Sequence, residues 1–308
     1  MHKPEFNYVF CTFKKHLRST IKLLLLNFRL FLRCNESWEM KIGSSFILFL
    51  FFLGAEAMAQ IESMPVSGRA SSGWSYTSKN IQSSFANQAG LSEIRGFSAA
   101  GYAEQTFLLP DFYNVGLAVA LPAGDFSAMG INFNSYGIEE FRQNRIGLAY
   151  GMKMGPDFSL GAQIDWYQMS IDNYGQANQL SFRLGFIYDL FSDFSVGIHI
   201  ANPLGLEIHE NSPLPSVFNI DLEWRISDQL VVGGGLVKDI DYDIGFKAAI
   251  HYHIHPSVTV ILGTITEPSS VSFGVLFNLS EWQIQSAAAY HQPLGFSPSA
   301  GFSYQKNQ

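Results

Sequence analysis

Three histidines lie close together in a pattern that could bind a metal ion. His251, His253 and His255 alternate with other residues just before Pro256. Alternate residues of a β-strand point to the same face, and imidazole nitrogens are common zinc ligands. However, no cysteine or close pair of carboxylates accompanies them, as a metal site would usually require. The alternatives are a weak metal site and a polar rim without metal. We favour the rim and expect no metal or cofactor.

Charged residues on alternating segments form a second candidate site. They are Arg145, Asp165, Arg183, Asp221, Glu223, Arg225 and Lys247. Because buried charges are usually paired, this mixture of signs predicts either ion pairs that hold the protein interior together or a selectivity and gating cluster. No serine signature accompanies the histidines and acids as in a hydrolase, so we expect no enzyme.

The run Gly233-Gly234-Gly235 is a third feature that could carry chemistry. It is not a phosphate-binding loop, because it lies inside a predicted strand and no helix follows it. A strand can bend where side chains are missing. We interpret the run as a kink or a lateral gap in the wall of a sheet.

The segment from Phe218 to Ile226 indicates which kind of element positions these residues. Large apolar residues such as Leu222 alternate with amide or charged residues such as Glu223. In a strand, this alternation gives one apolar face and one charged face. The apolar face would form the core of a soluble sandwich. In an outer-membrane barrel it would instead face lipid, and the charged face would line the lumen.

Fourteen strand-like segments follow one another from Arg95 to the end of the chain. They cover residues 95–108, 111–121, 125–135, 141–154, 157–170, 178–189, 193–202, 215–226, 229–238, 242–254, 257–266, 270–279, 281–291 and 295–304. An even number of strands of about 9–11 residues is typical of bacterial outer-membrane barrels. Tight turns such as Gly155-Pro156 alternate with longer connections such as Asn202 to Leu214, as in barrels whose loops differ at the two ends. The predicted fold class is all-β: a transmembrane antiparallel β-barrel of about 14 strands.

Composition favours the barrel over the soluble sandwich. Charged residues make up 15% of the 308 residues and aromatic residues another 15%, whereas a soluble domain usually has ~25% charged residues. Between residues 96 and 305 there are only seven Lys and Arg residues, too few for a soluble surface. The mean hydropathy of +0.09 is too low for a helical membrane protein with several spans. It fits a barrel whose polar lumen offsets an apolar exterior.

The N-terminus has the features of an export signal. Lys41 follows Met40, residues 46–53 form an apolar run, and Ala57-Met58-Ala59 supplies a small-x-small cleavage site. The alternative, a membrane anchor, is disfavoured because a spanning helix needs about 20 apolar residues. Residues 40–59 are therefore predicted to be a cleaved signal peptide. Residues 1–39 are predicted to be a translated upstream region before the true start, or an extended leader that is also removed.

Removal of residues 1–59 changes the charge and the cysteine content. These residues hold eight of the 19 Lys and Arg and four of the 26 Asp and Glu, so the remaining chain has 11 basic and 22 acidic residues. A net charge of −11 argues against nucleic acid as a partner. Both cysteines, Cys11 and Cys34, are removed as well. The exported chain therefore has no disulfide framework and no thiol nucleophile.

Short motifs in this chain resemble those of a known family. Residues 85–91 read Phe-Ala-Asn-Gln-Ala-Gly-Leu, and residues 202–205 read Asn-Pro-Leu-Gly. Together with Gly68-Arg69-Ala70 they resemble motifs of FadL-like outer-membrane barrels, and within these of the PorV/PorQ-like proteins of Bacteroidetes. The resemblance implies that residues 60–94 form a plug, or hatch, inside a barrel of residues 95–308. The residues assigned to the hatch motif are Phe85, Asn87, Gln88, Gly90 and Leu91.

The resemblance implies a location in the outer membrane of a Gram-negative bacterium and two alternative functions. The first is passive transport of small hydrophobic molecules, as in the fatty-acid transporters. The second is a role in type IX protein secretion, or a structural role without transport. The implied partners are membrane lipid, hydrophobic small molecules or secreted proteins, and the barrel-assembly machinery.

Overall fold

The computed structural model describes residues 64–209, 212–240 and 242–306. The predicted upstream region (1–39) and signal peptide (40–59) lie outside these residues and stay predictions. None of the helices in the described part of the chain is long and apolar enough to cross a membrane.

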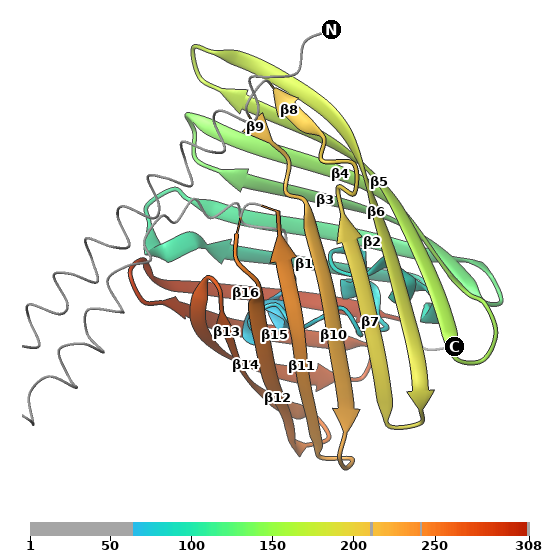
Figure 1. Cartoon of the computed structure of the whole chain (residues 1–308). Helices are drawn as coiled ribbons and strands as arrows, with labels where there is room; N and C mark the ends of the chain where they lie inside the picture. The colour runs from blue at the N-terminus through green and yellow to red at the C-terminus, as the bar shows by residue number, and fades with distance from the viewer. Residues whose placement is uncertain (1–63, 210–211, 241, 307–308) are drawn as a thin grey trace, which may run out of the picture. The chain divides into compact units, whose positions relative to one another are not determined.

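Fourteen antiparallel strands of the described chain close into a barrel (Figure 1). They are β1 (Ser98–Gln105), β2 (Tyr113–Gly124), β3 (Ser127–Gly137), β4 (Phe141–Lys153), β5 (Phe158–Ile171), β6 (Gly175–Phe191), β7 (Phe194–Ala201), β10 (Val217–Arg225), β11 (Leu230–Asp239), β12 (Gly245–His255), β13 (Val258–Thr266), β14 (Ser269–Leu279), β15 (Trp282–His291) and β16 (Gly295–Gln305). Each strand pairs with its neighbours in the chain, and β1 pairs with β16 to close the wall. The predicted fold class is confirmed, and each of the fourteen predicted segments corresponds to one strand.

The two ends of the barrel differ in their connections. At one end, called here the turn end, short turns join the strands. They are residues 125–126, 154–157, 192–193, 226–229, 256–257 and 280–281. The other end, the loop end, carries the connection 202–216, which contains a separate pair of short strands, β8 (Glu207–His209) and β9 (Ser212–Pro213). Several loop-end connections are shorter than predicted. For example, β5 and β6 continue into the expected loop and are joined by residues 172–174, because Asn173 and Gly175 take positive φ angles that allow a tight turn.

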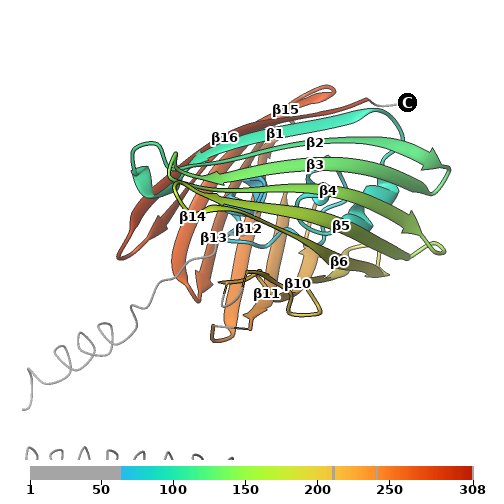
Figure 2. The ribbon, with the colours of Figure 1, turned by 90° about the horizontal axis from the view of Figure 1, so that it is seen from above.

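Residues 64–97, called here the hatch, precede the first strand and lie inside the barrel. The hatch contains the helix α3 (Val66–Ala70) and the 3-10 helices η1 (Ile81–Ser84) and η2 (Gln88–Glu93). α3 contacts β13 to β16, η1 contacts β1 to β3 and β16, and η2 contacts β3 to β6. Figure 2 shows these blue and cyan elements enclosed by the green and orange strands. The hatch therefore touches most of the circumference of the inner wall.

The barrel wall has its apolar side chains outside and its polar side chains inside. On β10, Leu222 and Trp224 are 42% and 49% exposed, whereas Asn219 and Asp221 are 2% and 0% exposed. This is the reverse of a soluble sheet, whose apolar face would be covered. The alternation in the sequence thus gives an apolar exterior around a polar, filled interior.

Candidate functional site

Glycines on the inner wall allow the hatch to approach the strands closely. A Cβ atom at Gly161 would overlap the backbone of Ala89, and one at Gly197 would overlap the carbonyl of Tyr76. The same relation holds around the wall, where the hatch also meets Gly151, Gly185, Gly233, Gly263, Gly274 and Gly301. Glycine is needed here because the partner is close backbone or a rigid side chain, which cannot move aside. The wall thus carries a track of glycines on which the hatch lies.

Asn87 anchors the predicted hatch motif to the wall. Its side-chain nitrogen lies 2.7 Å from the carbonyl oxygen of Tyr76 and 3.0 Å from that of Phe186, and its oxygen accepts a 3.2 Å hydrogen bond from the backbone N–H of Ala89. It also caps η2, so one side chain fixes both the turn and its position on the barrel. Gly90 completes the motif, since a Cβ there would overlap the carbonyl of Ser78.

The apolar hatch residues form a cluster with one half of the wall. Phe85 and Leu91 are fully buried, and the Phe85 ring lies 5.1 Å from that of Tyr102 in an edge-to-face arrangement. The hatch contributes Val66, Ala70, Ile81, Phe85, Leu91 and Ile94, and the wall contributes Ala100, Tyr102, Ala118, Ala120, Ala128, Ala149, Ile261, Leu276 and Ala287. These wall residues belong to β1 to β4 and β13 to β15. The interior therefore has an apolar half built largely of alanines.

A buried cluster of charges lies on β4, β5 and β6, at the border of this apolar half. The Asp165 carboxylate lies 2.7 Å from Arg183 Nε and 3.8 Å from Arg145 Nε, and all three side chains are almost fully buried. Gln163 donates a 2.6 Å hydrogen bond to Asp165, and Arg183 donates one of 3.0 Å to the Tyr167 hydroxyl. These residues join three adjacent strands through their side chains.

A second buried ion pair connects the wall to the hatch. Lys247 Nζ lies 2.6 Å from the Asp221 carboxylate, which also accepts 3.0 Å hydrogen bonds from the backbone N–H groups of Ser75 and Tyr76. The Lys247 ammonium donates to the Gly73 carbonyl at 3.1 Å and lies 4.8 Å from the centre of the Tyr76 ring. Asp221 is fully buried. The pair therefore fixes hatch residues 73–76 between β10 and β12.

The remaining two members of the predicted charge cluster lie towards the turn end. Glu223 accepts a 2.7 Å hydrogen bond from the Thr77 hydroxyl, and Arg225 is exposed. Both line a polar cavity of about 630 Å³ together with Lys79 and Asp189. The structure thus separates the seven predicted residues into three places. A strand pattern gives the face of each residue but not its height on the wall.

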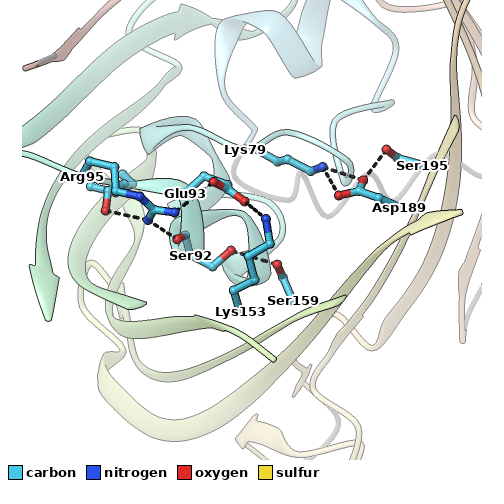
Figure 3. A network of polar contacts seen from close by, with 9 residues as sticks. Lys79, Ser92, Glu93, Arg95, Lys153, Ser159, Asp189 and Ser195 are labelled. Carbon is cyan, nitrogen blue, oxygen red and sulfur yellow. Dashed lines mark hydrogen bonds and ion pairs between the residues drawn. The ribbon is translucent and has the colours of Figure 1, made fainter. Parts of the chain in front are cut away.

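Two latches at the turn end hold the hatch to the strands, and sequence analysis missed both (Figure 3). Lys79 pairs with Asp189 at 2.5 Å, and Asp189 also accepts a 2.6 Å hydrogen bond from Ser195. Glu93 pairs with Lys153 at 2.8 Å. The members of each latch are far apart in the sequence and belong to no motif. Their only signal was that a charged residue of the hatch, such as Lys79 or Glu93, would need a partner of opposite charge on the wall.

The hatch and the wall also interact through an ion pair and a buried histidine that the sequence did not reveal. Arg69 in α3 contacts Glu104 of β1 through two hydrogen bonds of 2.5 and 2.9 Å. His199 is fully buried and stacks on Tyr76, with 4.9 Å between the ring centres. Each interaction joins a hatch residue to a different side of the barrel.

The three histidines of the predicted metal pattern have separate partners. His251 Nε2 lies 2.9 Å from the Ser71 hydroxyl in the hatch, and His253 Nδ1 lies 2.7 Å from the Thr259 hydroxyl. His255 Nδ1 accepts a 3.2 Å hydrogen bond from the backbone of Ser257. In the described ranges, no group of three or more His, Cys, Asp or Glu residues is arranged to bind a metal ion.

Of the two interpretations of Gly233-Gly234-Gly235, a kink or a lateral gap in the wall, the strand pairing contradicts the gap. All three glycines are paired with β10 on one side and β12 on the other in an unbroken register. Instead, a Cβ at Gly233 would overlap the Trp74 ring, and one at Gly235 would overlap Asp221. The missing side chains thus make room inside the wall and leave the wall itself closed.

Neighbouring glycines on β11 offer a matched test of the glycine track. We expect Gly233→Ala to displace Trp74 and to destabilise the barrel by about 1–3 kcal/mol, the usual cost of overpacking a core. Gly234→Ala should have little effect, because its Cβ would come no closer than 3.6 Å to another residue. Urea unfolding in detergent, followed by tryptophan fluorescence, measures both variants. Equal stability of the two would contradict the close packing of Trp74.

Comparisons with known proteins place the fold. No protein-family model matches the sequence, and no curated protein matches it either. The Ralstonia pickettii toluene transporter TbuX matches 80% of this chain and 100% of its own, at 13% identity with a TM-score of 0.62. The Pseudomonas putida toluene transporter TodX matches at 13% identity with a TM-score of 0.58, covering 80% of this chain and 99% of its own. A Pseudomonas aeruginosa FadL homologue matches at 12% identity with a TM-score of 0.54, covering 79% and 97%. The chain therefore has the fold of FadL-type outer-membrane barrels.

Proposed function

We propose that this protein is an outer-membrane barrel through which small hydrophobic molecules pass passively. The observation that carries the proposal is the apolar cluster between the hatch and the half of the wall formed by β1 to β4 and β13 to β15. Similar folds in solved structures belong to proteins described as toluene transporters. No enzymatic activity is proposed.

The apolar cluster gives a physical route for such molecules. Wall alanines such as Ala118 and Ala128 belong to the same buried cluster as the larger hatch residues Phe85 and Leu91. A shift of the hatch away from these strands would open a passage lined with alanine, isoleucine and leucine. Such a surface favours apolar solutes, which gain about 25 cal/mol for each Å² removed from water. The ion pair of Asp221 with Lys247 would anchor hatch residues 73–76 to β10 and β12, on the other side of the interior.

The proposed location follows from the barrel exterior and the sequence of the leader. Exposed apolar residues cover the outside of the wall, which matches a bilayer better than water. The short connections of the turn end would face the periplasm, where both ends of the barrel chain would lie. Export by the predicted signal peptide and insertion by the barrel-assembly machinery belong to the same proposal.

A reversible cross-link between the hatch and the wall tests this function. The Ser92 and Ser159 hydroxyls lie 3.0 Å apart, so cysteines at both positions are close enough for a disulfide. No other cysteine lies between residues 60 and 308. We expect the oxidised double variant to take up radiolabelled toluene or long-chain fatty acid several-fold more slowly than the reduced form. Whole cells expressing the protein provide the measurement, and Ser92→Cys alone is the control.

The two ways in which this test can fail are distinct. Uptake by the wild-type protein no faster than by cells without it would overturn the transport function. If uptake is equally fast in the oxidised and the reduced double variant, the protein transports the solute without a movement of η2 relative to β5. Loss of uptake that returns with reductant supports both parts.

A second candidate function is a PorV/PorQ-like role in type IX secretion, with secreted proteins as partners. It is supported by the hatch motifs and by the buried ion pair of Asp221 and Lys247, which ties the hatch to the wall and is unrelated to apolar transport. In that case, deletion of the gene in the native bacterium should block delivery of secreted proteins to the surface. Toluene and fatty-acid uptake should remain unchanged.

A further inference from the structure

The β6 strand continues far beyond its neighbour β7. It has 17 residues, whereas β7 has eight. On one side, β5 pairs with β6 over its whole outer part, up to Ile171 opposite Gly175. On the other side, the pairing with β7 ends where Arg183 faces Ala201. Residues 175–182 are therefore paired with a strand on one side only.

Three residues of this segment direct backbone groups towards the open side. The Phe182 carbonyl accepts a 2.9 Å hydrogen bond from the Asn202 N–H, which shows that Phe182 faces the β7 side. Backbone groups of a strand alternate in direction with a period of two, so Leu180, Asn178 and Gln176 face the same way. Within the described ranges, the pairing with β7 ends before these three residues, and their backbone N–H and C=O groups have no hydrogen bond to a turn or loop.

The open edge lies beyond the apolar band of the barrel. Leu180 is the last apolar residue on the outer face of β6 in this direction, and it is 54% exposed. Beyond it the outer face is polar: the amides of Asn144, Gln168 and Gln176 contact one another in sequence at 3.4 Å, and Arg142 and Ser170 follow on β4 and β5. Figure 1 shows the β5–β6 hairpin extending to the end of the barrel that carries β8 and β9. The edge is thus placed in water, accessible to another molecule.

The connection 202–216 packs on the inner face of this hairpin, and its described residues form no strand pairing with β6. Ile208 and Leu214 pack on Tyr167, next to Met169 and Ala177. The Asn202 side chain holds the connection in this position by donating to the Leu206 and Leu214 carbonyls at 3.1 and 3.0 Å. The connection therefore stiffens the hairpin from inside, and the pairing of β8 is with β9 alone.

The edge also lacks the usual protection against pairing. Exposed edge strands normally carry lysine, proline, a bulge or an inward charge that blocks the approach of another strand. Residues 175–181 read Gly-Gln-Ala-Asn-Gln-Leu-Ser, without a charge or a proline, and the register with β5 is regular. This segment therefore has the geometry of a strand ready to accept a further strand.

Charge around the edge indicates what kind of strand it would accept. The connections near the edge carry Glu139, Glu140 and Asp172, and one exposed cation, Arg142 of β4, lies beside them, so the local charge is net negative. The described residues of the β3–β4, β5–β6 and β7–β10 connections include no Lys or Arg. An extended polypeptide with basic residues would complement this acidic surrounding.

We propose that the free edge of β6, residues 175–180, binds an extended basic segment of a partner protein by strand addition. Main-chain hydrogen bonds to Gln176, Asn178 and Leu180 supply the affinity, and the acidic connections select basic partners. The site is separate from the hatch and from the apolar cluster. It does not depend on the transport function.

Proline at position 178 gives a sharp test. The Asn178 N–H points to the open side, so Asn178→Pro removes a docking group without removing a bond to β5, as edge strands tolerate. Asn178→Ala removes the side chain and keeps the N–H. The probe is a fluorescein-labelled Lys-Thr-Val-Thr-Val-Thr-Lys peptide, titrated against the full-length protein in detergent and followed by fluorescence anisotropy. A version with glutamate in place of both lysines tests the charge.

We expect Asn178→Pro to weaken binding of the lysine peptide about tenfold, the effect of losing one or two main-chain hydrogen bonds. Asn178→Ala, which keeps the N–H, should change the affinity less than about twofold. The glutamate peptide should bind several-fold more weakly. The proposal would be overturned if the wild type showed no saturable binding of the peptide. It would also be overturned if both variants bound the peptide equally well while heat-modified gel mobility showed that they were folded. If the wild-type protein were a dimer and the Asn178→Pro variant a monomer, the edge would bind a second copy of this chain. That result would overturn the proposal of a basic partner protein.

Discussion

Asp221→Ala is expected to destabilise the barrel by about 3–5 kcal/mol, because it leaves a buried lysine without its partner. Asp221 and Lys247 are both nearly inaccessible, and the ion pair between them is 2.6 Å long. The substitution also removes the acceptor for the N–H groups of Ser75 and Tyr76. The variant should therefore lose the attachment of the hatch as well as stability. Urea unfolding in detergent measures the first, and limited proteolysis of residues 73–79 measures the second.

A double variant separates the cost of the unpaired charge from the loss of the hatch contacts. Asp221→Leu combined with Lys247→Met removes both charges and keeps apolar volume, so its stability should recover much of the loss. Its hatch should remain more sensitive to protease, since the two N–H groups still lack their acceptor. A single Asp221→Ala variant as stable and protease-resistant as the wild type would show that the ion pair does not hold the hatch.

Leu222→Arg, at the next position of the same strand, is expected to block assembly of the barrel into membranes. Leu222 is on the outer face and 42% exposed. An arginine facing lipid near the centre of the bilayer costs about 2–4 kcal/mol, whereas in water it would cost little. Heat-modified gel mobility after refolding into vesicles measures the assembled fraction.

Glu223→Gln is the matched control for this experiment. Glu223 lies on the inner face towards the turn end, where its carboxylate accepts a hydrogen bond from Thr77 that an amide oxygen can also accept. The control should therefore assemble as the wild type does. If Leu222→Arg assembles normally while Glu223→Gln fails, the apolar face of the wall does not meet lipid.

The strands were predictable because most of them alternate between apolar and polar residues, which distinguishes the outer face from the inner face. The fourteen strand-like segments correspond to fourteen strands, and where polarity alternates, as at Leu222 and Asp221, the face of a residue follows from its parity alone. The hatch motif at residues 85–91 was visible as well. Its form was not, since η1 ends at Ser84 just before the motif and η2 begins within it at Gln88, capped by Asn87.

The site was only partly predictable, since its members are set by the stagger of the strands around the barrel. Arg183 was expected to share a cluster with Lys247, yet the first pairs with Asp165 and the second with Asp221. The latch of Lys79 and Asp189 joins residues 110 positions apart with no motif between them. A pattern of alternation contains no information about such long-range neighbours.

The sequence by itself determined the class of fold, the strands and, where polarity alternates, the face on which a side chain lies. These follow from local physics, because a period of two and a limited strand length are properties of short segments. Only the tertiary structure decided that Gly233 makes room for Trp74, that the charges form separate clusters, and that β6 has an open edge. Each depends on how the closed barrel aligns distant segments, and this alignment is fixed by the register of all fourteen strands together.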